Sequence, residues 1–162
     1  MAWDPLVKKV AWFGGAYLFV AATVALYIVM TGSFAGRGTG VDPETAARGH
    51  SHYEAHCARC HGADLKGQPG WETRRADGTV PAPPQDESGH TWQHPDRQIF
   101  DYIKLGGGIF SKRGERSEMP GYADQLSDPQ IWEVIAYIKS RWPEETRARQ
   151  LRANMIGGFE HH

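Results

Sequence analysis

The stretch Cys57-Ala58-Arg59-Cys60-His61 constrains this chain more than any other part of its sequence. It contains both cysteines of the 162 residues, and a histidine follows the second one directly. This spacing is typical of a c-type haem attachment site. Each thiol adds to one vinyl group of a haem, and a neutral imidazole is a good iron ligand. The motif therefore predicts one covalently bound haem c, attached through Cys57 and Cys60, with His61 on the iron.

Two other kinds of site also use a Cys-x-x-Cys pair. A thioredoxin-like redox dithiol needs a βαβ context, and the sequence has no such pattern. A structural zinc site needs further Cys or His at ligand spacing. His52 and His56 are near, but no second pair of cysteines exists. Covalent haem attachment is favoured over both.

A continuous apolar run lies near the N-terminus. Residues 10–30 carry no charged side chain, and a helix of that length spans roughly 30 Å, the thickness of a bilayer's hydrocarbon core. Lys8 and Lys9 precede the run and only Arg37 follows it closely, which places the N-terminus in the cytoplasm. A cleaved signal peptide is the alternative, but its apolar region is typically about 7–15 residues long. We therefore expect residues 1–30 to be a signal anchor with one transmembrane helix. It would hold the chain, single-pass, in the cytoplasmic (inner) membrane and place the haem domain in the periplasm.

Residues 31–42 are rich in glycine and are interpreted as a linker. A flexible linker of this length has an end-to-end distance of roughly 20 Å, which keeps the next domain close to the membrane. Small residues fall near one face of the expected span and would let a partner helix approach, although such residues are common in transmembrane helices anyway. They are Ala11, Gly15, Ala22 and Ala25.

Helix-start residues precede the haem motif. Asp42 is suited to the N-cap position and Pro43 to the first helical position. The helix that begins there is expected to run to about the attachment cysteines. Gly49 and Tyr53 are four residues apart and share one face, which suggests a close crossing by another helix.

Two further helices are expected after the motif. One begins at Pro95 and ends at Gly106, and the other follows a capping box formed by Ser127 and Gln130 and ends before Pro143. The residues expected to face the core are Ile99, Phe100 and Ile103 in the first, and Ile131, Val134, Ile135 and Ile138 in the second.

Two segments have no apolar periodicity. Residues 62–89 are rich in Gly, Pro and charged residues and predict a long loop, with a turn or short hairpin at 76–78. Residues 144–162 are interpreted as a polar C-terminal tail, with room for one more helix before the glycines at 157 and 158. The haem domain is therefore expected to span residues 43–143.

Met119 is the candidate for the second iron ligand. The chain has four methionines, and Met119 alone lies within the haem domain, whereas Met1, Met30 and Met155 lie in the anchor or the tail. His90 and His94 are the histidine alternatives, each also suited to a surface or propionate-contacting role. Trp92 has an indole N–H that would either donate to a haem propionate or leave the ring to pack on the haem edge.

Residues 43–142 together resemble the class I c-type cytochromes, in a membrane-anchored bacterial form with one haem. The resemblance rests on a helix with Gly49 and Tyr53, the motif Cys57 to His61, a long loop, Met119-Pro120, and a last helix containing Trp132-Glu133-Val134-Ile135-Ala136-Tyr137-Ile138-Lys139. It implies an all-α fold around one covalently bound haem, here preceded by the single N-terminal transmembrane helix.

The resemblance also implies two contacts. The first helix should cross the last one, with Gly49 and Tyr53 against Val134 and Tyr137. A proline carbonyl in the loop after the motif should orient His61. Four prolines compete for that role, Pro69, Pro81, Pro83 and Pro84, and we favour Pro83 or Pro84.

The expected function is electron transfer rather than enzymatic catalysis. His61 and Met119 would fill both axial positions, which leaves no site for a small-molecule substrate. The net charge of −1 gives no reason to expect a nucleic-acid partner, whereas a redox protein partner, such as a membrane complex of a respiratory chain, is expected. A basic rim near the haem edge would steer an acidic partner, or is simply a solvated loop; it comprises Lys104, Lys112, Arg113 and Arg116 against Glu115.

Two alternatives stay open at this point. The domain is a fixed electron-entry subunit of a larger membrane oxidoreductase, or the iron has an open position and serves a haem enzyme or a gas sensor. The second alternative requires that Met119 does not bind the iron.

Overall fold

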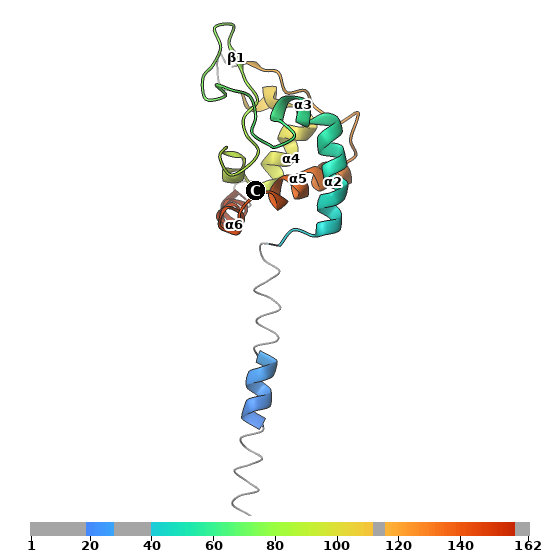
Figure 1. Cartoon of the computed structure of the whole chain (residues 1–162), viewed down its shortest axis with the longest axis vertical. Helices are drawn as coiled ribbons and strands as arrows, with labels where there is room; N and C mark the ends of the chain where they lie inside the picture. Colours follow the sequence, from blue (N-terminus) through green and yellow to red (C-terminus); the bar gives the residue numbers. More distant parts are fainter. Residues whose placement is uncertain (1–18, 28–39, 112–115, 158–162) are drawn as a thin grey trace, which may run out of the picture. The chain divides into compact units, whose positions relative to one another are not determined.

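The computed structural model describes residues 19–27, 40–111 and 116–157 (Figure 1). The chain divides into two units, Met1–Gly40 and Val41–His162. In the first unit, residues 19–27 are helical with exposed side chains. The rest of the predicted span at 10–30 and almost all of the predicted linker lie outside the described residues. Within the described residues, every helix is too short or too polar to cross a bilayer.

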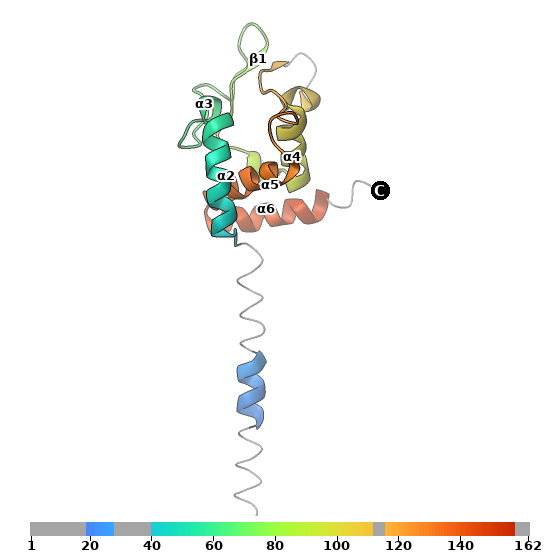
Figure 2. The same cartoon turned by 90° about the vertical axis from the view of Figure 1, so that its right-hand side faces the viewer.

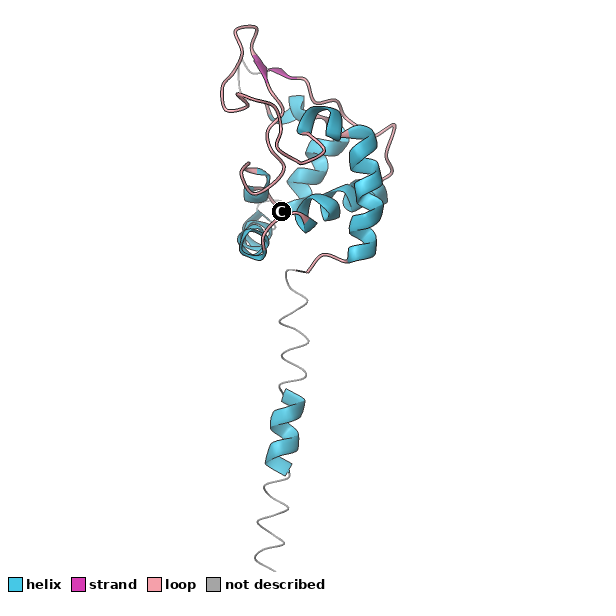
Figure 3. Ribbon diagram, in the orientation of Figure 1, coloured by secondary structure: helices cyan, strands magenta, loops and turns pink. Residues whose placement is uncertain are grey.

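The second unit consists of helices joined by long loops, with two very short strands (Figure 3). Its elements are α2 (Pro43–His56), α3 (Ala58–His61), β1 (Thr79–Val80), η1 (Thr91–Gln93), α4 (Asp96–Leu105), η2 (Gly107–Phe110), β2 (Arg116–Ser117), α5 (Asp128–Ser140) and α6 (Glu144–Gly157). The expectation of a helical domain is confirmed.

Helix α2 begins as predicted and crosses α5 at close range (Figure 2). The Asp42 carboxylate accepts the Thr45 backbone N–H at 2.8 Å and so caps the helix. At the crossing, a Cβ atom added to Gly49 would lie only 1.8 Å from the carbonyl oxygen of Glu133. The Tyr53 and Tyr137 rings lie 5.1 Å apart beside it. The implied crossing of the first and last helices is therefore confirmed.

Helices α4 and α5 pack together and bury the residues that the sequence placed in the core. The predicted capping box holds, because the Ser127 backbone N–H donates to the Gln130 side-chain oxygen at 2.8 Å. Stacking adds to the contact, since the rings of Phe100 and Trp132 lie 4.8 Å apart. The buried side chains of this interface include Ile99, Phe100 and Ile103 from α4 and Ile131, Val134, Ile135 and Ile138 from α5.

The loop after α3 contains the predicted turn, but its strand partner is distant in sequence. Gly78 has φ +86° and its N–H donates to the Arg75 carbonyl at 3.0 Å. Strand β1 then pairs in parallel with β2, with Thr79 opposite Arg116. The backbone N–H of Arg116 also donates to the Gly78 carbonyl at 3.0 Å. The loop is thus tied to the segment that leads into Met119.

Helix α6 belongs to the folded unit, although sequence analysis treated residues 144–162 as a tail. Its Gln150 side chain is 1% exposed and donates to the Asp96 carboxylate at 2.7 Å. Asn154 and Lys139 donate to the same carboxylate at 2.9 and 2.7 Å. Polar side chains around the Asp96 carboxylate hold the helix in place. The sequence of the helix therefore has no apolar stripe from which its packing could be predicted. The unit therefore continues past the expected boundary at residue 143.

Replacing Gly49 by alanine tests the crossing of α2 and α5. The added Cβ forces the helices apart, and we expect a loss of about 2–3 kcal/mol in the free energy of unfolding, the range for overpacking a close contact. Denaturant unfolding of the full chain measures it. Ser51 lies on the exposed side of the same helix, and Ser51→Ala should stay within about 0.5 kcal/mol. Equal stability of both variants would show that the crossing tolerates a side chain.

Candidate functional site

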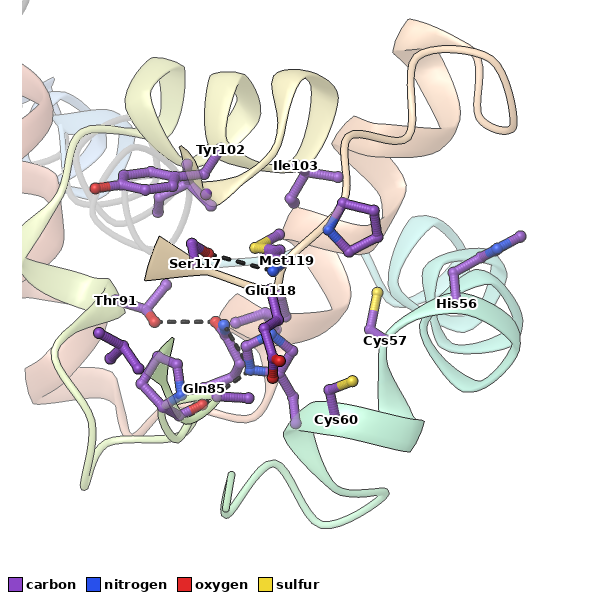
Figure 4. Close-up of a pocket in the computed structure, with 18 of the residues that line it drawn as sticks. His56, Cys57, Cys60, Gln85, Thr91, Tyr102, Ile103, Ser117, Glu118 and Met119 are labelled. Carbon is purple, nitrogen blue, oxygen red and sulfur yellow. Dashed lines mark hydrogen bonds between the residues drawn. The ribbon is translucent and has the colours of Figure 1, made fainter. Parts of the chain in front are cut away.

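All four predicted site residues line one cavity of about 290 Å³. Figure 4 labels three of them, Cys57, Cys60 and Met119. Cys57, Cys60 and His61 come from the α2–α3 junction, and Met119 comes from the segment between β2 and α5. Much of the remaining wall is apolar and is formed by side chains such as Val80, Ile99, Ile103, Val134 and Ile138. An apolar cavity with two thiols, an imidazole and a thioether on its walls has the donor set that a covalently attached haem needs.

The cysteine motif forms one helical turn that continues directly from α2. The Cys57 N–H donates to the Tyr53 carbonyl at 2.8 Å, and the His61 N–H donates to the Cys57 carbonyl at 3.0 Å. The two cysteines do not form a disulfide. Burial, with Cys60 nearby, raises the pKa of the Cys57 thiol to about 12. A buried thiol with a raised pKa is unlike the low-pKa thiols of redox dithiols.

The zinc alternative finds no support in the part of the chain that the structure describes. No group of three or more His, Cys, Asp or Glu side chains in residues 19–27, 40–111 and 116–157 is arranged to hold a metal ion. His52 instead lies 3.4 Å from the Glu133 carboxylate. The attachment motif therefore lacks the further ligands that a structural zinc site requires.

His61 is buried and is held by a carbonyl 22 residues later in the chain. Its Nδ1 lies 2.9 Å from the carbonyl oxygen of Pro83, so Pro83 is the proline that contacts the ring. When Nδ1–H donates to this oxygen, the other ring nitrogen, Nε2, is left as the metal-binding atom. Burial lowers the pKa of His61 against the opposing effect of the Pro83 hydrogen bond. A neutral imidazole is the form that binds iron.

Contacts from three directions fix the segment that carries Pro83. Gln85 donates its backbone N–H to the Leu65 carbonyl at 2.8 Å, and its own carbonyl accepts the indole N–H of Trp142 at 2.8 Å. Gly67 has φ +68°, and a Cβ there would lie 2.6 Å from the Pro83 carbonyl carbon. Gln85 is a site residue that the sequence did not predict, and its side-chain Nε2 is drawn 3.2 Å from His61 Nδ1. No local pattern marks that contact.

Met119 is positioned by backbone contacts on both sides. Its N–H donates to the Ser117 hydroxyl at 3.2 Å, and its carbonyl accepts the Gly107 N–H at 3.1 Å (Figure 4). Tyr122, three residues later, donates its hydroxyl to the His56 carbonyl at 2.7 Å. The methionine segment is therefore tied directly to the end of α2, where the attachment motif begins.

The two histidine alternatives and Trp92 have different surroundings in the structure. His90 and His94 both line the cavity with ring centroids 5.4 Å apart, and the Trp71 ring stacks on His90 at 5.7 Å. Burial and His94 lower the pKa of His90. The Trp92 indole N–H donates to the Gly89 carbonyl at 3.0 Å. It is therefore engaged within the protein, which corrects the suggestion that it serves a haem propionate.

The predicted basic rim is only partly described. Lys104 pairs with the Asp128 carboxylate at 2.7 Å, and Arg116 lies 3.8 Å from the Asp77 carboxylate. Lys112, Arg113 and Glu115 lie outside the described residues. The two described cations thus have carboxylate partners and provide less net positive charge than the sequence suggested.

Comparison with known proteins agrees with this geometry. Residues 46–142 match the family model described as Cytochrome c. No curated protein matches the chain. The family match implies covalently bound haem c, and the thiols of Cys57 and Cys60 have the spacing that such attachment uses.

Tyr53 offers a test of how the motif is supported. It is fully buried, and its hydroxyl donates to the carbonyl of Gly62, the residue after His61, at 2.9 Å. Tyr53→Phe removes this bond and leaves the Leu65 N–H, at 3.1 Å, as the remaining donor to that carbonyl. It should cost about 1 kcal/mol of unfolding free energy, measured by denaturant unfolding at neutral pH.

The same variant has a predictable pH dependence. Burial raises the pKa of Tyr53, whereas an unfolded tyrosine titrates near pH 10. The unfolded chain thus releases this proton first, so the contribution is fully present below about pH 10 and is lost above it. Unfolding measured from neutral to alkaline pH should show a shallower loss for Tyr53→Phe than for the wild type. Parallel curves would contradict the buried, hydrogen-bonded tyrosine.

Proposed function

Because the chain belongs to the cytochrome c family, we propose that it is a membrane-anchored monohaem electron carrier with His61 and Met119 as its axial ligands. Cys57 and Cys60 would hold the haem covalently. The proposal rests on one observation. These four side chains line one cavity, and Nδ1 of His61 is within hydrogen-bond distance of the Pro83 carbonyl. The bound haem supplies one-electron chemistry between ferrous and ferric iron.

The residues of this chain would do three things for that chemistry. Pro83 orients the His61 ring and leaves Nε2 free to bind. Ser117 and Gly107 fix the backbone of Met119, whose thioether favours a raised reduction potential. The apolar walls limit water at the iron, which also tunes the potential. With two protein ligands in place, no iron position is left for a substrate, so a carrier is favoured over an enzyme or a gas sensor.

The membrane anchor is the second part of the proposal. It is supported by the uncharged run at 10–30 and by the two lysines before it. We propose one span in the cytoplasmic membrane, with the haem domain in the periplasm on the glycine-rich linker at 31–42. Such a tether confines the domain to partners at the membrane surface.

A fixed subunit of a larger membrane oxidoreductase is the second candidate. The short linker favours it, because a domain held within roughly 20 Å of its anchor has little reach. The small residues at 11, 15, 22 and 25 favour it as well, since such a face lets another membrane helix approach closely.

Substituting Met119 tests the ligand set. Met119→Leu keeps the volume but removes the sulfur, so the ferric protein should lose the long-wavelength methionine-to-iron charge-transfer band and its reduction potential should fall. Optical spectra during potentiometry measure both. Met155→Leu is the control, because Met155 is 56% exposed on α6 and should leave both unchanged. A wild-type protein without this band would refute methionine ligation and revive the open-site alternative.

Purification from membranes distinguishes a carrier from a fixed subunit. We expect the chain to stay in the membrane fraction after an alkaline carbonate wash and, once extracted in mild detergent, to elute alone at moderate ionic strength. Release by carbonate would argue against the anchor. Stoichiometric co-elution with other subunits at that ionic strength would identify it as part of a complex.

A further inference from the structure

Gln85 makes a contact with the haem-ligand histidine that the proposed function does not use. The atom of its side-chain amide that faces His61 is drawn as Nε2 and lies 3.2 Å from Nδ1, the same nitrogen that lies 2.9 Å from the Pro83 oxygen. On its other side, the amide atom drawn as Oε1 accepts the Thr91 hydroxyl at 2.9 Å. Gln85 therefore links a buried hydroxyl to the back of the His61 ring.

The chemistry of the three groups fixes how the amide is oriented. An imidazole that binds iron through Nε2 carries its proton on Nδ1, so a group facing Nδ1 must be an acceptor. The two ends of an amide are told apart only by their hydrogen-bond partners. A hydroxyl accepts as well as donates, so Thr91 suits either end. Since Nε2 and Nδ1–H are both donors, we assign the amide turned by 180° from this placement, so that Gln85 Oε1 accepts from Nδ1–H and Gln85 Nε2 donates to Thr91 Oγ1.

The position of Gln85 is built into the fold. Its backbone N–H and carbonyl are both bonded, to Leu65 and to the Trp142 indole at 2.8 Å each. Trp142 is 2% exposed and Thr91 is 8% exposed. The side chain therefore cannot leave the ring without breaking a buried contact with Thr91, and substitutions of the side chain leave both backbone bonds in place.

We propose that Gln85 is a positioning residue that shares the Nδ1 proton of His61 with Pro83 and thereby lowers the reduction potential of the haem. The inference rests on the proposed ligation of iron by His61. A second acceptor draws the proton away from the ring and makes the imidazole a stronger electron donor. A stronger donor stabilises ferric iron, which carries one more positive charge than ferrous iron.

Substitutions at Gln85 should move the potential in opposite directions. Gln85→Leu removes the acceptor at similar volume and should raise the potential. We expect about a threefold change in the ferric-to-ferrous ratio at fixed solution potential, or about 30 mV at 59 mV per tenfold change. Gln85→Glu supplies a stronger acceptor and should lower the potential. Thr91→Val removes the hydroxyl that binds the other end of the Gln85 amide. It should raise the potential by less than Gln85→Leu does. Gln93→Leu, at an exposed position on η1, is the control and should change nothing.

Potentiometry with optical spectra on the full-length holoprotein decides the question. Opposite shifts for Gln85→Leu and Gln85→Glu support the proposal. Potentials equal to the wild type overturn it, and a fall in Gln85→Leu overturns the acceptor role by showing that the amide N–H faces the ring. If Gln85→Leu does not yield a holoprotein, the potentials of Gln85→Glu and Thr91→Val test the proposal in the same way. Unmoved potentials with a histidine-ligated spectrum refute only the role of Gln85, whereas a wild-type spectrum without histidine ligation refutes the proposed function as well.

Discussion

The close crossing of α2 and α5 at Gly49 is the contact on which the rest of the folded unit depends. A side chain there would meet the backbone of Glu133, so the two helices approach as closely as their backbones allow. Helix α2 ends at the cysteine motif, and α5 leads to Trp142, whose indole holds Gln85. The crossing therefore sets the distance between the haem-attachment turn and the loop that supports its histidine. A change at this contact therefore affects both the attachment turn and the loop that supports His61.

The walls of the cavity are otherwise made by chain segments with little regular structure. Such segments bury few apolar side chains and depend on individual hydrogen bonds for their position. Here the loop after the motif is held at Pro83 and Gln85, and the methionine segment is held through Ser117 and Tyr122. The parallel pairing of β1 with β2 joins these two segments to each other. In the proposed function, the histidine side and the methionine side are thus coupled through backbone contacts as well as through the iron.

Local signals in the sequence predicted the helices and their ends. The Asp42 cap, the Ser127–Gln130 box and the apolar stripe of α5 act within a few residues, so they can be recognised without the fold. The haem motif and Met119 were identified in the same way, from residue type and spacing. The choice of Pro83 among four prolines, the contact of Gln85 with His61 and the pairing of Thr79 with Arg116 join residues 22 or more positions apart. These depend on how the long loop folds back, which no local pattern encodes. Docking of α6 was missed because polar residues around Asp96 hold it, and polar residues at these positions resemble a solvated surface.

In the proposed function, His61 and Met119 bind the two faces of one haem iron. X-ray absorption fine structure at the iron edge of the purified full-length holoprotein can identify these ligands, because sulfur scatters differently from nitrogen and lies farther from the metal. We predict one sulfur and five nitrogen scatterers in the first shell of both the ferric and the ferrous protein. A first shell of nitrogen and oxygen alone, or one with fewer than six ligands, would refute ligation by His61 and Met119.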